Sequence, residues 1–338
     1  MSRFVRFLLR ALGTLAALIV LAIAAFSIYL STRPPGKTVK AAGILSVPAP
    51  FRIGRPFIDY MLIAGPRLYV GYASHGMVGV VDTTTNQVVA TIGGLGRVHG
   101  VAIVVDRNLG FASSSGDNNV NVFDLATNKL LKKIPAGDDP DAIIYDRKAQ
   151  LIYVGDHNGK TATLIDPASE SVVGTVPLGG EPEYPQANPE SGLIYQNLED
   201  TSELVVVDPQ KQIVVKRYKI DPGEGPTGLA LDAADHRLFS AASNRKLIVL
   251  NADTGNIVTV LPIGAGVDGA GYDPSLRRVY TANAAGTMTV IQQDSPDHYR
   301  VLENAPTHFG GHSLVIDPTT HRIYVAYFGS VAMYDALP

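Results

Sequence analysis

The sequence predicts an all-β fold, a seven-bladed β-propeller with four-stranded blades. A fifteen-residue phrase recurs seven times, starting at residues 56, 98, 140, 182, 226, 267 and 311. A period of about 40 residues with several short strands per repeat is typical of propeller blades. The repeats are rich in Val, Ile and Tyr, with apolar residues at every second position. This pattern favours strands over the helical repeats of similar length.

Each repeat divides into the same four expected strands. In the third repeat they are Pro140–Asp146 (A), Leu151–His157 (B), Thr161–Asp166 (C) and Ser171–Gly179 (D). Strand C ends on a polar residue in every repeat: Asp82, Asp124, Asp166, Asp208, Asn251, Gln292 and Asp335. Seven polar residues at one repeat position predict a structural role, in which each side chain bonds to the backbone of the C–D turn.

The two ends of the repeat region predict how the ring closes. The last repeat stops after its third strand, Ser330–Asp335, while an apolar stretch, Gly43–Val47, precedes the first repeat. We expect this stretch to be the outer strand of blade seven. The pairing would close the ring and cover two exposed sheet edges. The predicted propeller therefore spans residues 43–338.

The N-terminal stretch 11–30 predicts a membrane anchor. It contains no charged residue, and as a helix it is just long enough to cross a hydrocarbon core of about 30 Å. Arg3, Arg6 and Arg10 precede it, so the positive-inside rule places residues 1–10 in the cytoplasm. With 31–42 as a linker, we expect a single-pass inner-membrane protein with its propeller in the periplasm or cell exterior. The alternative is that the N-terminal segment is a signal peptide, which is cleaved near Ala24 so that the protein is secreted.

Several repeat motifs resemble a known family. They are LIYV at 151–154, VVD at 80–82, LID at 164–166, KKIPAG at 132–137 and PTGLALD at 226–232. This pattern resembles the YVTN-repeat β-propellers (YncE-like) and covers residues 43–338. The resemblance implies the propeller fold. It does not select a function, because relatives include presumed binding proteins, dehydrogenase subunits and proteins associated with single-stranded DNA.

A ring of polar residues is the predicted ligand site. The second residue of the phrase lies where strand A enters the central channel, and the seven repeats place there Phe57, His99, Asp141, Glu183, Thr227, Asp268 and His312. The B–C loops share this face and add His75, Asp156, His157 and Asn197. Imidazoles and carboxylates together are ligands of divalent metals. His99 and Asp141, from adjacent blades, are the expected ligands if the mouth holds such an ion, whose identity the sequence leaves open.

The charge distribution predicts the kind of partner. All 31 Asp and Glu residues lie beyond residue 40, whereas six of the 28 Lys and Arg residues precede residue 41. On the predicted mouth face the acidic residues outnumber the basic ones. We therefore expect a cationic small molecule or protein partner and no nucleic acid, which needs a basic surface. The chain has no cysteine, so disulfides and thiol nucleophiles are excluded.

The leading functional interpretation is a membrane-anchored, extracytoplasmic binding or scaffold protein with its ligand site at the channel mouth. The alternative is a metal-assisted hydrolase or lactonase that uses the same mouth. The serine-rich loop 113–119 lacks the G-x-S-x-G pattern of a nucleophile elbow. The sequence leaves open whether the protein is an enzyme, which ligand it binds and its oligomeric state.

Overall fold

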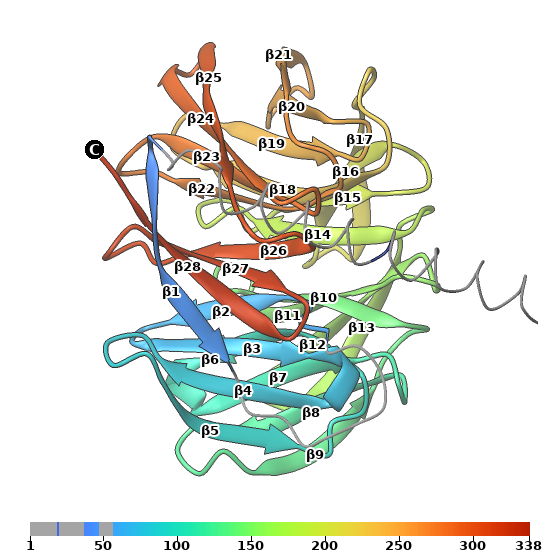
Figure 1. Ribbon diagram of the computed structural model, residues 1–338. Coiled ribbons are helices and arrows are strands. Elements are labelled where there is room, and N and C mark those ends of the chain that lie inside the picture. Colours follow the sequence, from blue (N-terminus) through green and yellow to red (C-terminus); the bar gives the residue numbers. More distant parts are fainter. Residues whose placement is uncertain (1–18, 20–36, 47–56) are drawn as a thin grey trace, which may run out of the picture. The chain divides into compact units, whose positions relative to one another are not determined.

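The computed structural model describes residues 19, 37–46 and 57–338. Residues 37–338 contain seven four-stranded antiparallel sheets, arranged as blades around a central channel (Figure 1). The expected seven-bladed propeller with four-stranded blades is confirmed. No helix in the described part of the chain has the length and apolarity to cross a membrane. The expected anchor at 11–30 and the alternative cleavage near Ala24 fall, apart from residue 19, outside the described residues.

Six blades follow one another along the chain, and each runs from the channel outward. They are β2–β5 (Met61–Ala64, Arg67–Tyr72, Met77–Asp82, Gln87–Gly93), β6–β9 (Val98–Val104, Leu109–Ser114, Asn119–Asp124, Leu130–Pro135), β10–β13 (Pro140–Asp146, Leu151–Asp156, Thr161–Asp166, Ser171–Pro177), β14–β17 (Pro182–Ala187, Ile194–Leu198, Glu203–Asp208, Ile213–Lys219), β18–β21 (Pro226–Asp232, Arg237–Ala242, Lys246–Asn251, Ile257–Pro262) and β22–β25 (Val267–Asp273, Arg278–Asn283, Thr287–Ser295, His298–Pro306). Two 3₁₀ turns, η1 (Ala73–His75) and η2 (Val105–Arg107), lie within the first two blades.

Blade seven combines the two ends of the repeat region. Its strands are β26–β28 (Gly311–Ile316, Arg322–Tyr327, Ser330–Ala336), and β1 (Val39–Ser46) pairs antiparallel with β28 at the outer edge. β1 begins four residues before the expected Gly43, within the stretch assigned to the linker. Val39 is buried there against blades six and seven, and Leu45 is buried between blades seven and one. These contacts extend the strand in the N-terminal direction.

The turns confirm most of the structural roles expected for the strand C residues. Backbone N–H groups of the C–D turns donate to five of them: Asp82, Asp124, Asp166, Asp208 and Asn251. Gln292 instead donates to backbone carbonyls, and Asp335 pairs with Arg322. The A–B turns use the same device, which the sequence analysis missed, through Asp146, Asn188, Asp232, Asp273 and Asp317.

An irregularity near the start of the channel strand recurs in blades two to seven. In blade three Pro140 lies opposite Asp156 and Ile143 opposite Val154, so one extra residue is inserted in strand A. The register shifts in the same place in β6, β14, β18, β22 and β26. A bulge of this kind redirects side chains. Here it lies at the second residue of the strand, where the expected ring of polar residues is found.

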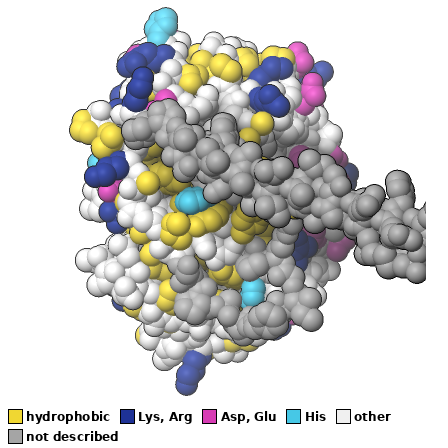
Figure 2. All heavy atoms as spheres, in the orientation of Figure 1, with side chains coloured by type: hydrophobic (Ala, Val, Ile, Leu, Met, Phe, Trp, Pro, Cys, Tyr) yellow, Lys and Arg dark blue, Asp and Glu magenta, His cyan; other side chains and the backbone are white. Residues whose placement is uncertain are grey.

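The blades pack face to face through apolar clusters between neighbours. Between blades seven and one, for example, Met61, Val70 and Met333 are buried together. The channel strands contact one another in the circular order β2, β6, β10, β14, β18, β22, β26 and again β2. On the face shown in Figure 2, charged side chains lie mostly toward the periphery, and hydrophobic ones lie both near the middle and at the upper and left margins. The seven channel strands bound the channel in an unbroken circle.

Candidate functional site

The position of blade one in the polar ring belongs to Asp59, and the expectation of Phe57 there is wrong. Met61 lies opposite Val70 in blade one, as Ile143 lies opposite Val154 in blade three. Asp59 therefore has the register of Asp141, two residues before the first regular pair. The cause is the A–B turn: two residues separate β2 from β3, whereas four separate β10 from β11. The prediction counted positions from the start of the fifteen-residue repeat and therefore selected Phe57, two residues before Asp59.

With Asp59 in place, carboxylates and imidazoles alternate over five of the seven blades. His312 Nδ1 lies 2.6 Å from Asp268 Oδ2, and His312 Nε2 lies 3.1 Å from Asp59 Oδ1. The other oxygen of Asp59 lies 2.5 Å from His99 Nδ1, which is 2.9 Å from Asp141 Oδ1. Phe57 packs edge-to-face on His312 with ring centroids 4.7 Å apart. Asp59 therefore joins two histidines that the sequence left separated by an apolar residue.

The chain of polar contacts continues through Tyr60 to blade four. The Tyr60 hydroxyl lies 3.2 Å from Asp141 Oδ2 and 3.4 Å from Glu183 Oε2. Glu183 Oε1 is 3.4 Å from His157 Nε2, which is 3.9 Å from Glu199 Oε2. Contacts thus run from Asp268 in blade six to Glu199 in blade four. Tyr60 and Glu199 were not among the expected site residues.

The pKa values of two ring histidines follow from this pairing. Burial alone would lower the pKa of His99, but hydrogen bonds to Asp141 and Asp59 raise it to about 10. For His312 burial acts in the same way, and the charges of Asp268 and Asp59 raise its pKa to about 11. Burial would raise the pKa of Asp59, yet hydrogen bonds from His312 and His99 hold it well below its usual range. At neutral pH this segment therefore holds a protonated imidazole on each side of the ionised Asp59.

The pKa values of Asp141 and Glu183 shift in the opposite direction. Burial raises the pKa of Asp141, against the hydrogen bond from His99. Burial likewise raises the pKa of Glu183 to about 8, opposed by the hydrogen bond from His157 and assisted by the charge of Asp141. The hydrogen bonds to Glu183 and Glu199 in turn raise the pKa of His157. A carboxyl that titrates near neutral pH in a cavity is typical of functional sites.

These groups surround a cavity of about 230 Å³, here called the polar chamber. Its lining consists of Phe57, Asp59, Tyr60, Arg97, His99, Asp139, Asp141, His157, Glu183, Asp268 and His312. Six of the expected site residues are in this set: His99, Asp141, Glu183, Asp268, His312 and His157. The chamber is large enough for a hydrated metal ion or a small organic cation.

Four expected site residues do not line the polar chamber. The buried carboxylate of Asp156 accepts hydrogen bonds from the hydroxyls of Thr161 and Thr163 and from the Gly137 N–H. The side-chain amide of Asn197 donates to the carbonyls of Thr227 and Gly228. The Thr227 hydroxyl donates to the Val267 carbonyl, and His75 is buried 2.8 Å from Ser74 Oγ. The polar atoms of these four residues form hydrogen bonds with loops and neighbouring blades.

Two groups of the described residues have the composition of a metal site. Asp59, His99 and Asp141 each offer one donor atom, and these atoms lie within 4.8 Å of one another. His157, Glu183 and Glu199 form the second group. The first includes His99 and Asp141, the expected ligand pair, and adds Asp59. It is also the more buried group, since the side chain of His99 is 7% exposed and that of Glu199 is 41% exposed.

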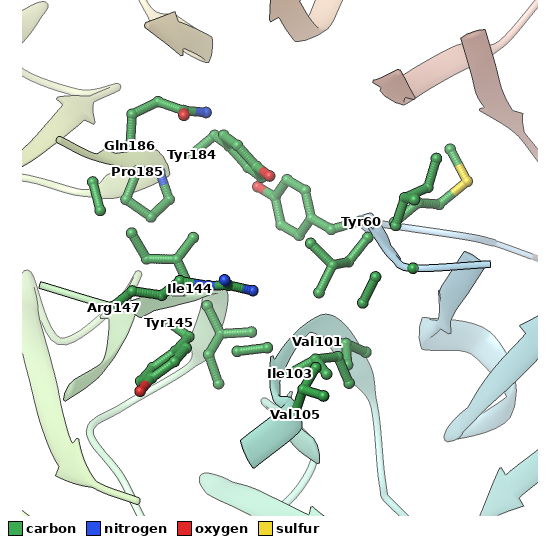
Figure 3. A pocket seen from close by; sticks show the side chains of 18 residues that line it. Tyr60, Val101, Ile103, Val105, Ile144, Tyr145, Arg147, Tyr184, Pro185 and Gln186 are labelled. Carbon is green, nitrogen blue, oxygen red and sulfur yellow. The ribbon is translucent and has the colours of Figure 1, made fainter. Parts of the chain in front are cut away.

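A second cavity of about 400 Å³, the apolar chamber, lies on the other side of Tyr60. Its wall consists of the later residues of strands A in blades one to four, among them Leu62, Ile103 and Ile144. Tyr60 lines both chambers, and its ring packs on Tyr184 with centroids 5.3 Å apart. Figure 3 shows the two tyrosines reaching toward each other across the channel. They form a floor between a charged end and an apolar end.

Comparison with known proteins identifies the fold and no family. No family model matches the chain, and no curated protein matches its sequence. Among solved structures the chain is similar to a chain of hydrazine synthase from Kuenenia stuttgartiensis, with a TM-score of 0.67 and 15% identity over 84% of this chain and 96% of that chain. At this level of identity the similarity supports the propeller architecture alone.

Proposed function

We propose that this protein is a membrane-anchored, extracytoplasmic binding propeller whose polar chamber captures a divalent metal ion. One observation carries the proposal: oxygens of Asp59 and Asp141 lie 2.5 Å and 2.9 Å from the same nitrogen, His99 Nδ1. A single N–H that is shared between two carboxylates forms a bifurcated hydrogen bond, in which each half is weaker than a linear bond. A metal ion can accept an electron pair from all three atoms, and carboxylates with imidazole suit zinc, manganese and iron.

The electrostatics of the polar chamber also favour a cation. Burial of carboxylates is costly unless positive charge compensates them. Asp59, Asp141, Glu183 and Asp268 line the chamber together with three histidines and one arginine. Protonated histidines provide this compensation at neutral pH, and a metal ion would replace part of it. Metal capture therefore requires His99 to lose a proton, which makes the affinity dependent on pH.

The location in the cell is part of the same proposal. The uncharged stretch 11–30, preceded by three arginines, supports a single-pass anchor in the inner membrane with the propeller outside the cytoplasm. Cleavage near Ala24 would release the same propeller in the same compartment. The repeat motifs support placing the chain among the YVTN-repeat, YncE-like propellers. None of these assignments changes the chemistry expected in the polar chamber.

The test is a metal-binding measurement on the full chain after chelator treatment. Equilibrium dialysis against Zn²⁺ or Mn²⁺ should give one ion per chain, and the ion should raise the melting temperature. Asp59→Asn should abolish this binding. Asp139→Asn is the matched control, because Asp139 lines the same chamber and is not paired with the ring histidines. If neither metal binds, or if both variants bind as the wild type does, the proposal fails.

A second candidate function is a metal-assisted hydrolase or lactonase. The observation in its favour is Glu183, whose pKa is raised to about 8 and whose carboxyl lies 3.4 Å from the Tyr60 hydroxyl. Such a group can exchange a proton with a substrate near neutral pH. The expected result is hydrolysis of a lactone or ester from a substrate panel. Glu183→Gln should remove that turnover and retain the metal. A panel without any turnover would leave the binding function as the better description.

A further inference from the structure

The apolar chamber takes its name from its residues, most of which are aliphatic. Its exposed surface is divided about evenly between apolar and polar atoms, the polar ones including those of Tyr145, Arg147 and Gln186. Leu62, Ile63 and Ile144 retain partial exposure, whereas Val101 and Ile143, which also line the cavity, are buried. A volume of about 400 Å³ falls within the range of cavities that bind small molecules. Aliphatic side chains in a concave site of this size can contact the apolar part of a small molecule.

One charged group, Arg147, lies among these apolar side chains. It belongs to the A–B turn of blade three, and Figure 3 shows its guanidinium extending over the chamber toward the middle. It forms no ion pair with any described residue. The neighbouring carboxyl of Asp146 is directed to its own turn, where it accepts the N–H groups of Lys148 and Ala149. An unpaired guanidinium above an apolar wall is complementary to a carboxylate on an apolar body.

We propose that the apolar chamber is a second ligand site, which binds a small hydrophobic monocarboxylate. The carboxylate pairs with Arg147 at the rim. The apolar body contacts Leu62, Ile103 and Ile144, and its far end meets the floor of Tyr60 and Tyr184. The charges of the two chambers support opposite preferences: cations at the polar end and anions at the apolar end. This site is independent of the metal proposed above.

A pair of probes with the same body and opposite charge tests the site. Binding of 4-phenylbutyrate and of 4-phenylbutylamine to the full-length chain is measured by isothermal titration calorimetry, with the detergent buffer alone as blank. We expect 4-phenylbutyrate to bind at least about tenfold more tightly than the amine, because only the carboxylate can form a charge-assisted hydrogen bond with Arg147. Equal affinity of the two probes, or no detectable binding of 4-phenylbutyrate, would overturn the proposal.

Three variants locate the binding. Arg147→Gln should weaken 4-phenylbutyrate binding by about tenfold, since it removes the charge and keeps the length of the side chain. Arg107→Gln is the matched control: Arg107 lies in the corresponding turn of blade two and does not line the chamber. Ala64→Phe should block binding, because Ala64 lines the cavity and is partly exposed. Unchanged binding in Arg147→Gln, or equal losses in both arginine variants, would contradict the assignment.

Discussion

The polar and apolar chambers share the channel strands of blades one to four, yet they differ in chemistry. The second residue of strand A, as in His99 and Asp141, points into the polar chamber. Residues two to four positions later on the same strands, such as Ile103 and Ile144, line the apolar chamber. Distance along one repeated strand therefore determines depth in the channel. A repeat that is nearly uniform in its core can thus carry two different sites on one axis.

Opening the ring should remove both chambers together, and this is the largest expected effect. Deleting residues 41–48 takes away most of β1 and the buried Leu45. We expect a loss of about 4 kcal/mol or more in the free energy of unfolding, measured by chemical denaturation. Leu45→Ala should reproduce about half of this loss, and Ile44→Ala, at an exposed position, very little. An unchanged melting temperature of the deletion variant would show that β1 does not hold the ring closed.

Asp59→Asn should affect the polar chamber and leave the apolar chamber intact. It removes the carboxylate between His99 and His312 and leaves both imidazoles without one of their partners. Breaking a buried ion pair costs about 3 kcal/mol. We expect a loss of that size in the free energy of unfolding, together with unchanged 4-phenylbutyrate affinity. If that affinity fell as well, the two chambers would be coupled through the Tyr60–Tyr184 floor.

The stability of the propeller should fall as the pH rises above neutrality. His99 and His312, with pKa values of about 10 and about 11 in the fold, keep protons that the unfolded chain loses near 6.5. Their contribution is complete below about pH 6.5 and is lost as the pH rises through 10 to 11. Thermal unfolding between pH 7 and pH 10 should show this decline, and Asp59→Asn should flatten it. A wild-type profile that is flat or rises over this range would exclude the pairing described here.

Tyr60→Phe should have the smallest effect. It removes the hydroxyl between Asp141 and Glu183 and keeps the ring that packs on Tyr184. We expect a loss of about 1 kcal/mol in the free energy of unfolding. The affinity for 4-phenylbutyrate should change less than twofold. A large loss of that affinity would mean that the hydroxyl itself forms part of the apolar chamber.

The repeat allowed most of the fold to be predicted. The period and alternation identified the four strands of each blade, and strand C of the third repeat has the expected bounds, Thr161–Asp166. β1 was expected to begin at Gly43 because the proline-containing, basic stretch 31–42 was assigned to a linker. Contacts distant in sequence, such as the packing of Val39 against blades six and seven, extend the strand to Val39. No local pattern contains that information.

The site was predicted only where the ring residue is the second residue of the repeat. Six ring residues have that position, but the A–B turn of blade one is shorter than the others, so Asp59 was missed. Register counted from Tyr69 across the Gly65-Pro66 turn could have found it. His75, Asp156 and Asn197 were expected because of their loops alone. Their side chains bond to neighbouring loops and blades, which depends on packing that the sequence does not display.

The most direct test of the metal assignment is a titration that counts protons as well as ions. Zn²⁺ is added to the chelator-treated full chain in two buffers that differ in ionisation enthalpy, so the heats report how many protons are released. We predict one ion per chain, about one proton released from His99, tighter binding as the pH rises, and no binding by Asp59→Asn. Binding without proton release, or equal binding by Asp59→Asn and Asp139→Asn, would contradict a metal site at Asp59, His99 and Asp141.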